Sequence, residues 1–206
     1  MNKALENILQ NNPAIWRAGE IAKGKQKGLS TGFSELDALL PDDGWPLNSL
    51  VEIITPRWGV GELKLLLPLL LQTTKKSHCA VWISPPYVPY APAFHHHGVA
   101  LENMIVLQEE TIGEHCLWVF EKILRTKTCG VAMAWPKQLP EKSVRRLQLA
   151  ATQGHSLGIV FRNKEVKSSP AAIRIRLTRL KAGLQVDILK ARGASRFQSV
   201  VIPLSY

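Results

Sequence analysis

The stretch TPRWGVGELKLLLPLL, residues 55–70, has the outline of a phosphate-binding loop that leads into a helix. Such a loop works because glycines let backbone N–H groups wrap the phosphates, while a lysine neutralises charge and a hydroxyl binds magnesium. Gly59 and Gly61 are present, but Glu62 stands where the lysine belongs and Leu63 where the hydroxyl belongs. A carboxylate beside a triphosphate adds repulsion, on the order of 1 kcal/mol per unit charge at ~4 Å in water. The sequence therefore predicts a degenerate loop that binds no nucleotide cofactor.

Other residues with reactive or metal-binding side chains do not form a recognisable site. Three adjacent histidines, His95 to His97, point in different directions on a helix and cannot converge on one metal ion. The three cysteines, Cys79, Cys116 and Cys129, are widely spaced and contain no C-x-x-C pair, so we expect buried free thiols. We therefore predict that the protein has no catalytic residues and no metal.

The net charge of +10 is distributed unevenly along the 206 residues. Residues 1–30 carry +3, residues 31–140 carry −3 and residues 141–206 carry +10. A basic C-terminal third suggests a surface that meets phosphates or an acidic protein, although an ordinary solvated basic face is the alternative. The candidate residues for weak, sequence-independent contact with nucleic acid are Arg145, Arg146, Arg162, Lys164, Lys167, Arg174, Arg176 and Arg179.

Buried strands alternate with helical segments through most of the chain. Continuous apolar runs of about five residues are typical of strands buried on both faces, and they occur at 50–55, 80–84, 104–108, 130–135 and 157–161. The intervening segments have helical periodicity, and Pro68 is expected to kink or shorten one of them. Alternating apolar and basic residues around Gly183 predict a closing antiparallel hairpin. The expected fold is thus α/β, a mainly parallel sheet flanked by helices.

The polar N-terminal region predicts a separate unit before this core. Residues 1–27 read as a helix, a short apolar segment and a basic linker, and residues 28–206 as one core domain. In the segment STGFSELDALL, Ser30 and Thr31 are possible helix caps. The richest apolar stretch, LKLLLPLLLQ, is too short to span a bilayer, so we expect a cytoplasmic protein.

The order of these motifs resembles the RecA core. The segment LSTGFSELDALLPDDGWPLNSLVEIITP is similar to the RecA region that leads into its phosphate loop, and AAIRIRLTRL with QVDILKARGASRFQ is similar to its closing hairpin. The stretches TPRWGVGELKLLLPLL, SPPYVPYAPA and CGVAMAWP resemble the ImuA family, RecA-like proteins of bacterial translesion synthesis. A more distant resemblance, in LLLPLL and LGIVFR, is to the SulA division inhibitors.

The RecA resemblance implies roles for particular positions. The glutamate that activates water in RecA falls on Pro86, and the strand-end aspartate that supports magnesium falls on Trp135, so the resemblance implies a pseudo-ATPase. Lys190 and Arg192 match the two basic residues with which RecA reaches a neighbour's ATP. Ile15 and Trp16 match the anchors of its subunit-clasping arm.

The ImuA resemblance implies a non-catalytic adaptor in SOS-induced translesion synthesis, located at the nucleoid after DNA damage. Its expected partners are the ImuB-type inactive relative of Y-family polymerases, RecA and an error-prone C-family polymerase, with no membrane contact. The alternative is a SulA-like inhibitor that binds the tubulin-like division protein. SulA is shorter and lacks the STGFSELDALL segment and the long N-terminal arm, which favours the adaptor.

Overall fold

The computed structural model of the protein describes residues 27–191 and 198–204, and contains one eight-stranded sheet. The strand order is β3-β2-β4-β5-β1-β6-β7-β8. The strands are β1 (Leu50–Ile54), β2 (Cys79–Ile83), β3 (Met104–Leu107), β4 (Cys129–Ala134), β5 (Leu157–Arg162), β6 (Ile173–Leu180), β7 (Gly183–Ala191) and β8 (Gln198–Ile202). Strands β1 to β6 pair with one another in parallel, whereas β7 pairs antiparallel with both β6 and β8. The predicted α/β class and closing hairpin are confirmed.

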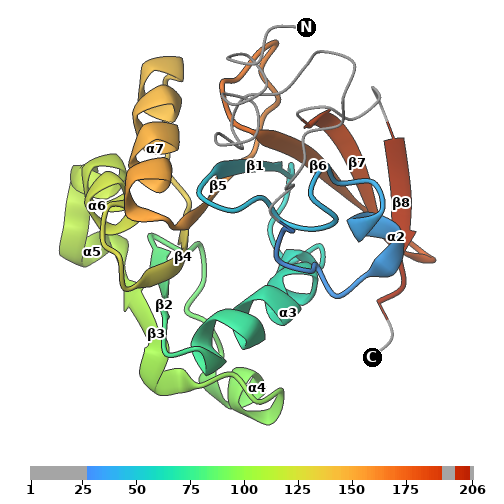
Figure 1. Ribbon diagram of the computed structural model, residues 1–206, viewed down its shortest axis with the longest axis horizontal. Coiled ribbons are helices and arrows are strands. Elements are labelled where there is room, and N and C mark those ends of the chain that lie inside the picture. Colours follow the sequence, from blue (N-terminus) through green and yellow to red (C-terminus); the bar gives the residue numbers. More distant parts are fainter. Residues whose placement is uncertain (1–26, 192–197, 205–206) are drawn as a thin grey trace, which may run out of the picture.

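Helices cover both faces of this sheet (Figure 1). They are α2 (Ser34–Asp37), α3 (Glu62–Lys75), α4 (Ala91–His96), α5 (Glu109–Ile112), α6 (Cys116–Leu124) and α7 (Glu141–Gly154), with 3-10 turns η1 (Leu101–Asn103) and η2 (Gly113–His115). Within the described residues, no helix is long and apolar enough to cross a membrane.

Each central strand is buried on both faces, because alternate side chains enter two separate cores. On β1, Val51 and Ile53 pack in the core beneath α3, whereas Leu50 packs with Phe120 of α6 and Val144 of α7 in the other core. Successive side chains of a strand point to opposite faces, so both sets of positions must be apolar. This explains the continuous apolar runs in the sequence.

Helix α3 continues through Pro68, so of the two effects expected of this proline, a kink or a shorter helix, the shortening is wrong. The Pro68 ring packs against Gly32, where an added Cβ would lie 2.5 Å from Cγ of the proline. The φ of Gly32 is also positive, at +83°. The proline thus supports the close approach of the segment that precedes β1.

The segment before β1 folds onto the core as the sequence suggested, but by different contacts. Ser30 and Thr31 do not cap a helix; the Ser30 hydroxyl and the Thr31 N–H both donate to the carboxylate of Asp37, at 2.6 and 2.8 Å. Leu29 and Trp45 form an isolated antiparallel bridge, and Trp45 is fully buried. Helix α2 is only four residues long.

Strand β8 was not predicted, and a polar network joins it to the sheet. Asp187 on β7 accepts hydrogen bonds from Arg176 of β6, Gln185 of β7 and Ser199 of β8. Burial alone would raise the pKa of Asp187, but these hydrogen bonds and the arginine charge lower it below its usual value. One ionised carboxylate therefore links three antiparallel strands.

Candidate functional site

The loops that follow β1 to β5 gather at one edge of the sheet, where parallel α/β folds place their ligand sites. The loop between β1 and α3 carries the phosphate-loop pattern of the sequence. Gly59 has φ +77° and Gly61 has φ +119°, values in the left-handed region that other residues rarely adopt. Both glycines thus adopt backbone conformations that favour glycine.

The carboxylate of Glu62 closes this loop from within. Its Oε1 accepts a hydrogen bond from the Gly59 N–H at 2.8 Å, and its Oε2 accepts one from the Gly61 N–H at 3.1 Å. The side chain is almost completely buried, with 5% exposure. Backbone N–H groups of this kind would face a phosphate in a nucleotide-binding loop. Here the chain's own anion occupies them.

Aromatic rings fill the region beside the loop. The Trp135 ring, at the end of β4, stacks on Phe161 of β5 with centroids 4.4 Å apart and planes 4° apart, and on Trp82 of β2 at 5.6 Å. Trp58 of the loop meets Phe161 edge to face at 6.2 Å. Trp135 and Pro86 occupy the positions where the resemblance to RecA expected an aspartate and a glutamate. The rings of Trp58, Trp82, Trp135 and Phe161 are called here the aromatic column. None of them could hold magnesium or activate water.

Sequence reasoning did not find the aromatic column or the capping role of Glu62. The signal for the column was the presence of Trp82, Trp135 and Phe161 at or near the ends of successive buried runs. Strand ends at the same sheet edge bring such residues together, but only the strand order tells which of them are neighbours.

The predicted basic residues do not form one continuous surface. Arg162 and Arg174 both pair with the fully buried Glu52, and Arg174 is itself only 5% exposed, so the prediction of a solvent-facing cation is wrong for Arg174. Both guanidinium groups lie beside Glu52, where their positive charges compensate the buried carboxylate.

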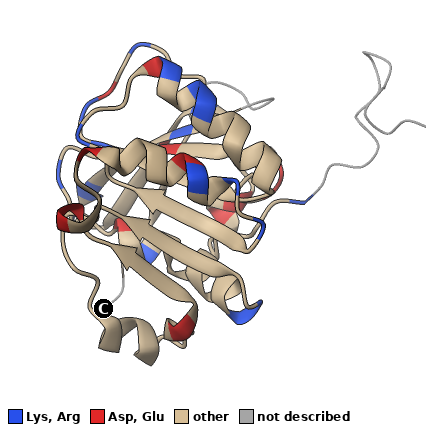
Figure 2. Cartoon of the chain, turned by 90° about the vertical axis from the view of Figure 1, so that its left-hand side faces the viewer, with Lys and Arg blue, Asp and Glu red and all other residues tan. Residues whose placement is uncertain are grey.

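The other predicted basic residues lie outside the sheet interior. Arg145 pairs with Glu141, Arg146 with Glu121, and Arg176 with both Glu165 and Asp187. Lys164, Lys167 and Arg179 are exposed. Figure 2 shows basic and acidic residues interleaved on the side of the molecule that carries α6 and α7. Contact with nucleic acid stays a prediction, weakened by this charge neutralisation.

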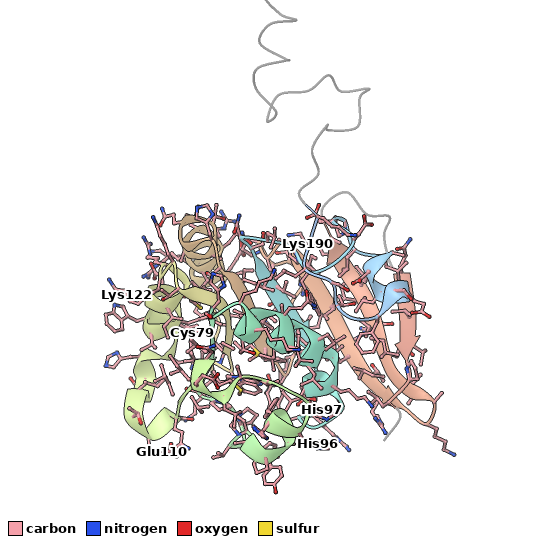
Figure 3. All side chains as sticks on the ribbon, turned by 60° about the horizontal axis from the view of Figure 1, so that its bottom comes forward. Cys79, His96, His97, Glu110, Lys122 and Lys190 are labelled. Atoms are coloured by element: carbon pink, nitrogen blue, oxygen red, sulfur yellow. The ribbon has the colours of Figure 1, made fainter. Side chains whose placement is uncertain are left out.

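Of the four residues predicted to bind partners, only Lys190 is described. It lies at the end of β7, is exposed, and its Nζ donates to the Ser169 carbonyl at 2.7 Å. Ile15, Trp16 and Arg192 lie outside the described residues. In Figure 3 Lys190 is well separated from Glu110, which lies on α5 at the edge that carries the phosphate loop.

The histidines and cysteines form no metal site among the described residues. His95, His96 and His97 are exposed on and just after α4 (Figure 3). Burial raises the pKa of the Cys116 thiol and raises that of Cys129 to about 12, so both stay protonated at neutral pH, while Cys79 is half-buried.

The fold and the site together define a RecA-like α/β protein whose phosphate loop is closed by its own carboxylate. A crystal structure of the RadB recombinase has the same fold, with a TM-score of 0.67, 14% identity, and coverage of 86% of this chain and 96% of that one. RecA from Streptococcus sanguinis is 30% identical over 131 residues, which is 59% of this chain and 33% of RecA.

The family is identified by a match that covers part of the chain. The family described as "Cell division inhibitor SulA" matches residues 56–158, half of the chain, and the protein belongs to this family. The cell division inhibitor SulA of Serratia marcescens is 29% identical over 99 residues, 48% of this chain and 58% of the relative. That of Edwardsiella piscicida is 30% identical over 108 residues, with 64% of the relative covered. The chain thus spans less than two thirds of these relatives, and the finer resemblance to ImuA stays a prediction.

Proposed function

We propose that the protein is a non-catalytic, protein-binding member of the SulA family that acts in the SOS response to DNA damage. The observation that carries the proposal is the Glu62 carboxylate on the Gly59 and Gly61 amides. A RecA-like protein whose own carboxylate occupies its phosphate loop is expected to act by binding other proteins through its surface and not by catalysing a reaction.

Two independent features support the absence of nucleotide chemistry. The first is electrostatic, since a bound triphosphate would have to displace or face the buried Glu62 carboxylate without a lysine at that position. The second is steric and chemical, since Trp135 and Phe161 stack where a magnesium-supporting carboxylate would be needed. Each feature alone would weaken ATP binding, and they act at different atoms of the nucleotide.

We expect no binding of a fluorescent ATP analogue in the presence of magnesium, up to concentrations on the order of 100 μM, whereas functional sites commonly bind in the micromolar range. Equilibrium anisotropy on the full chain measures this. Glu62→Ala should also fail to bind, because the lysine and the hydroxyl are still missing. Saturable micromolar binding by the unaltered protein, or magnesium-dependent hydrolysis, would contradict the proposal.

The family match supports the tubulin-like division protein as the partner. It runs from the phosphate loop to the start of β5, and the similar proteins from Serratia and Edwardsiella are named as cell division inhibitors. On this comparison, division inhibition is better supported than the adaptor role favoured by the sequence alone.

A second candidate, the adaptor of translesion synthesis, is favoured by the parts outside that match. The segment before β1 is packed on the core through Trp45, and β6 to β8 add three strands after residue 158. These parts are consistent with the RecA similarity and with binding to RecA or to the inactive polymerase relative.

The two candidates predict different results with purified proteins. As a division inhibitor, the chain should lower the GTP-dependent polymer that the division protein forms, by about five-fold at equimolar concentration for a sub-micromolar complex. As an adaptor, it should leave that polymer unchanged and be retained on immobilised RecA or on the inactive polymerase relative. Failure in all three assays would overturn the proposed function.

A further inference from the structure

Two adjoining cavities lie at the carboxyl edge of the sheet, beside the closed phosphate loop. Their volumes are about 630 and 760 Å³. The wall they share is formed by Ser84, Glu109, Glu110, Trp135, Pro136 and Lys137. Together they form one groove, called here the edge groove, which the aromatic column closes at its base.

One side of the edge groove is an exposed apolar loop. Tyr87, Val88 and Tyr90 are 71%, 70% and 72% exposed, and Tyr87 and Val88 line the cavity. Pro85, Pro86 and Pro89 punctuate this loop and restrict its backbone. Three large apolar side chains held together in water are more than scattered surface residues, and such clusters mark binding sites.

The base of the edge groove holds polar atoms without partners. The indole Nε1 of Trp135, a residue that is 8% exposed, has no hydrogen-bond partner among the described residues. The Oγ of Ser84, 9% exposed, has no nitrogen or oxygen partner there either, although the Cys116 thiol is beside it. Both residues line both cavities. Within the described part of the chain, the indole Nε1 atoms of Trp45 and Trp82 in the core are likewise buried and unpartnered, so these atoms mark a dry, apolar groove base and not a position for a ligand acceptor.

The rim of the edge groove is acidic in a chain of net charge +10. Glu109 and Glu110 line both cavities and Glu114 the second, whereas the one lysine lining them, Lys137, is already paired with Glu109. The hydrogen bond and the charge of Glu109 raise the pKa of Lys137, so the lysine is protonated and bound. The remaining charge disfavours phosphate ligands and favours lysine or arginine side chains.

We propose that the edge groove binds an extended segment of a partner protein that combines proline or other apolar residues with lysine or arginine. Apolar side chains would pack against Tyr87, Val88 and Trp58, and a cation would meet Glu110. Extended proline-containing segments are recognised in this way by aromatic-lined grooves. The inference deepens the proposed function, because it names the surface and the chemistry through which a partner is held.

Selection from a phage library of random decapeptides on the full chain tests the proposal. Enriched peptides should combine lysine or arginine with proline or large apolar residues. The absence of enrichment, or enrichment of acidic peptides, would overturn it. Magnesium-ATP at millimolar concentration should not displace an enriched peptide, and displacement would identify the groove as a nucleotide site instead.

Variants then locate the binding site of an enriched, fluorescently labelled peptide. Tyr87→Ala and Glu110→Gln should each weaken its binding about ten-fold, as for residues at the centre of a small interface. Trp118→Ala is the matched control, since Trp118 is also an exposed aromatic residue, at 58%, and does not line the edge groove. The indole N–H resonance of Trp135 should shift on binding. Equal binding by all variants would remove the proposal.

Failure of this inference is distinguishable from failure of the proposed function. If the full chain binds the division protein or RecA and Tyr87→Ala binds it equally well, the function stands and the groove is not its surface. If peptides are selected as expected but neither protein is bound, the groove stands and the partner assignment is wrong.

Discussion

Replacing Glu52 with alanine should lower the free energy of unfolding by about 3–5 kcal/mol, the loss expected when one member of a buried ion pair is removed. Glu52 is fully buried on the central strand β1, and its two carboxylate oxygens accept hydrogen bonds from Arg162 on β5 and Arg174 on β6. Alanine leaves two guanidinium groups in the sheet without a counter-charge. Urea denaturation followed by circular dichroism measures the loss.

The second contacts of the two arginines place the expected loss toward the upper end of this range. Arg162 also donates to the Leu139 carbonyl at 2.9 Å, and Arg174 to the Val166 carbonyl at 2.8 Å. Loss of Glu52 therefore frees two loops as well as two charges. Because stability is lost through the ion triad and not through the phosphate loop, the closed Glu62 contact should survive in the variant.

Two further variants make the Glu52 prediction decisive. Glu52→Gln keeps the shape and loses the charge, so its loss should be smaller and it remains measurable if the alanine variant fails to fold. Glu141→Ala removes an acid whose pair with Arg145 is exposed on α7, and it should change stability little. Equal losses for Glu52→Ala and Glu141→Ala would mean that the buried triad contributes no more to the free energy of unfolding than an exposed ion pair does.

The parallel sheet could be predicted from sequence because burial on both faces leaves a local signature. Residues 50–54 of β1 and 157–161 of β5, within the predicted runs at 50–55 and 157–161, are apolar or glycine at all positions but one, and each strand faces two cores. Glu52 is the exception inside the first run. A single acid in such a run predicts a buried partner, but not that Arg174, about 120 residues later, supplies it.

The features that sequence reasoning missed depend on contacts between distant segments. Arg174 and Arg176 alternate with apolar residues and look alike in sequence, yet one is buried against Glu52 and the other pairs at the surface with Glu165. Likewise, the phosphate-loop pattern indicated a lost lysine at Glu62, but not that this carboxylate would bind the loop amides. A sequence pattern can single out a residue such as Arg174 or Glu62. The role of that residue depends on which neighbour the fold places beside it.

Replacing Phe161 with alanine should cost about 3–5 kcal/mol of unfolding free energy, the usual loss for a buried large aromatic residue. Phe161 is 1% exposed and lies between Trp135, at 4.4 Å, and Trp58 of the phosphate loop, at 6.2 Å. Its removal leaves a cavity under both. Thermal and urea unfolding measure the loss, and near-ultraviolet circular dichroism should show the altered tryptophan environment.

Trp118→Ala is the control for Phe161→Ala, because it removes an aromatic ring that is 58% exposed and lies under the Lys122 ammonium group on the surface of α6. Its effect on stability should be small, and similar losses for the two variants would contradict a structural role for the column. Phe161→Ala also distinguishes the effect of the aromatic column on stability from its effect on nucleotide binding. Phe161→Ala opens space beside the loop, but Glu62 still occupies the loop amides, so the variant should remain unable to bind the ATP analogue. Binding by Phe161→Ala would instead assign the exclusion of nucleotide to the aromatic column rather than to the carboxylate.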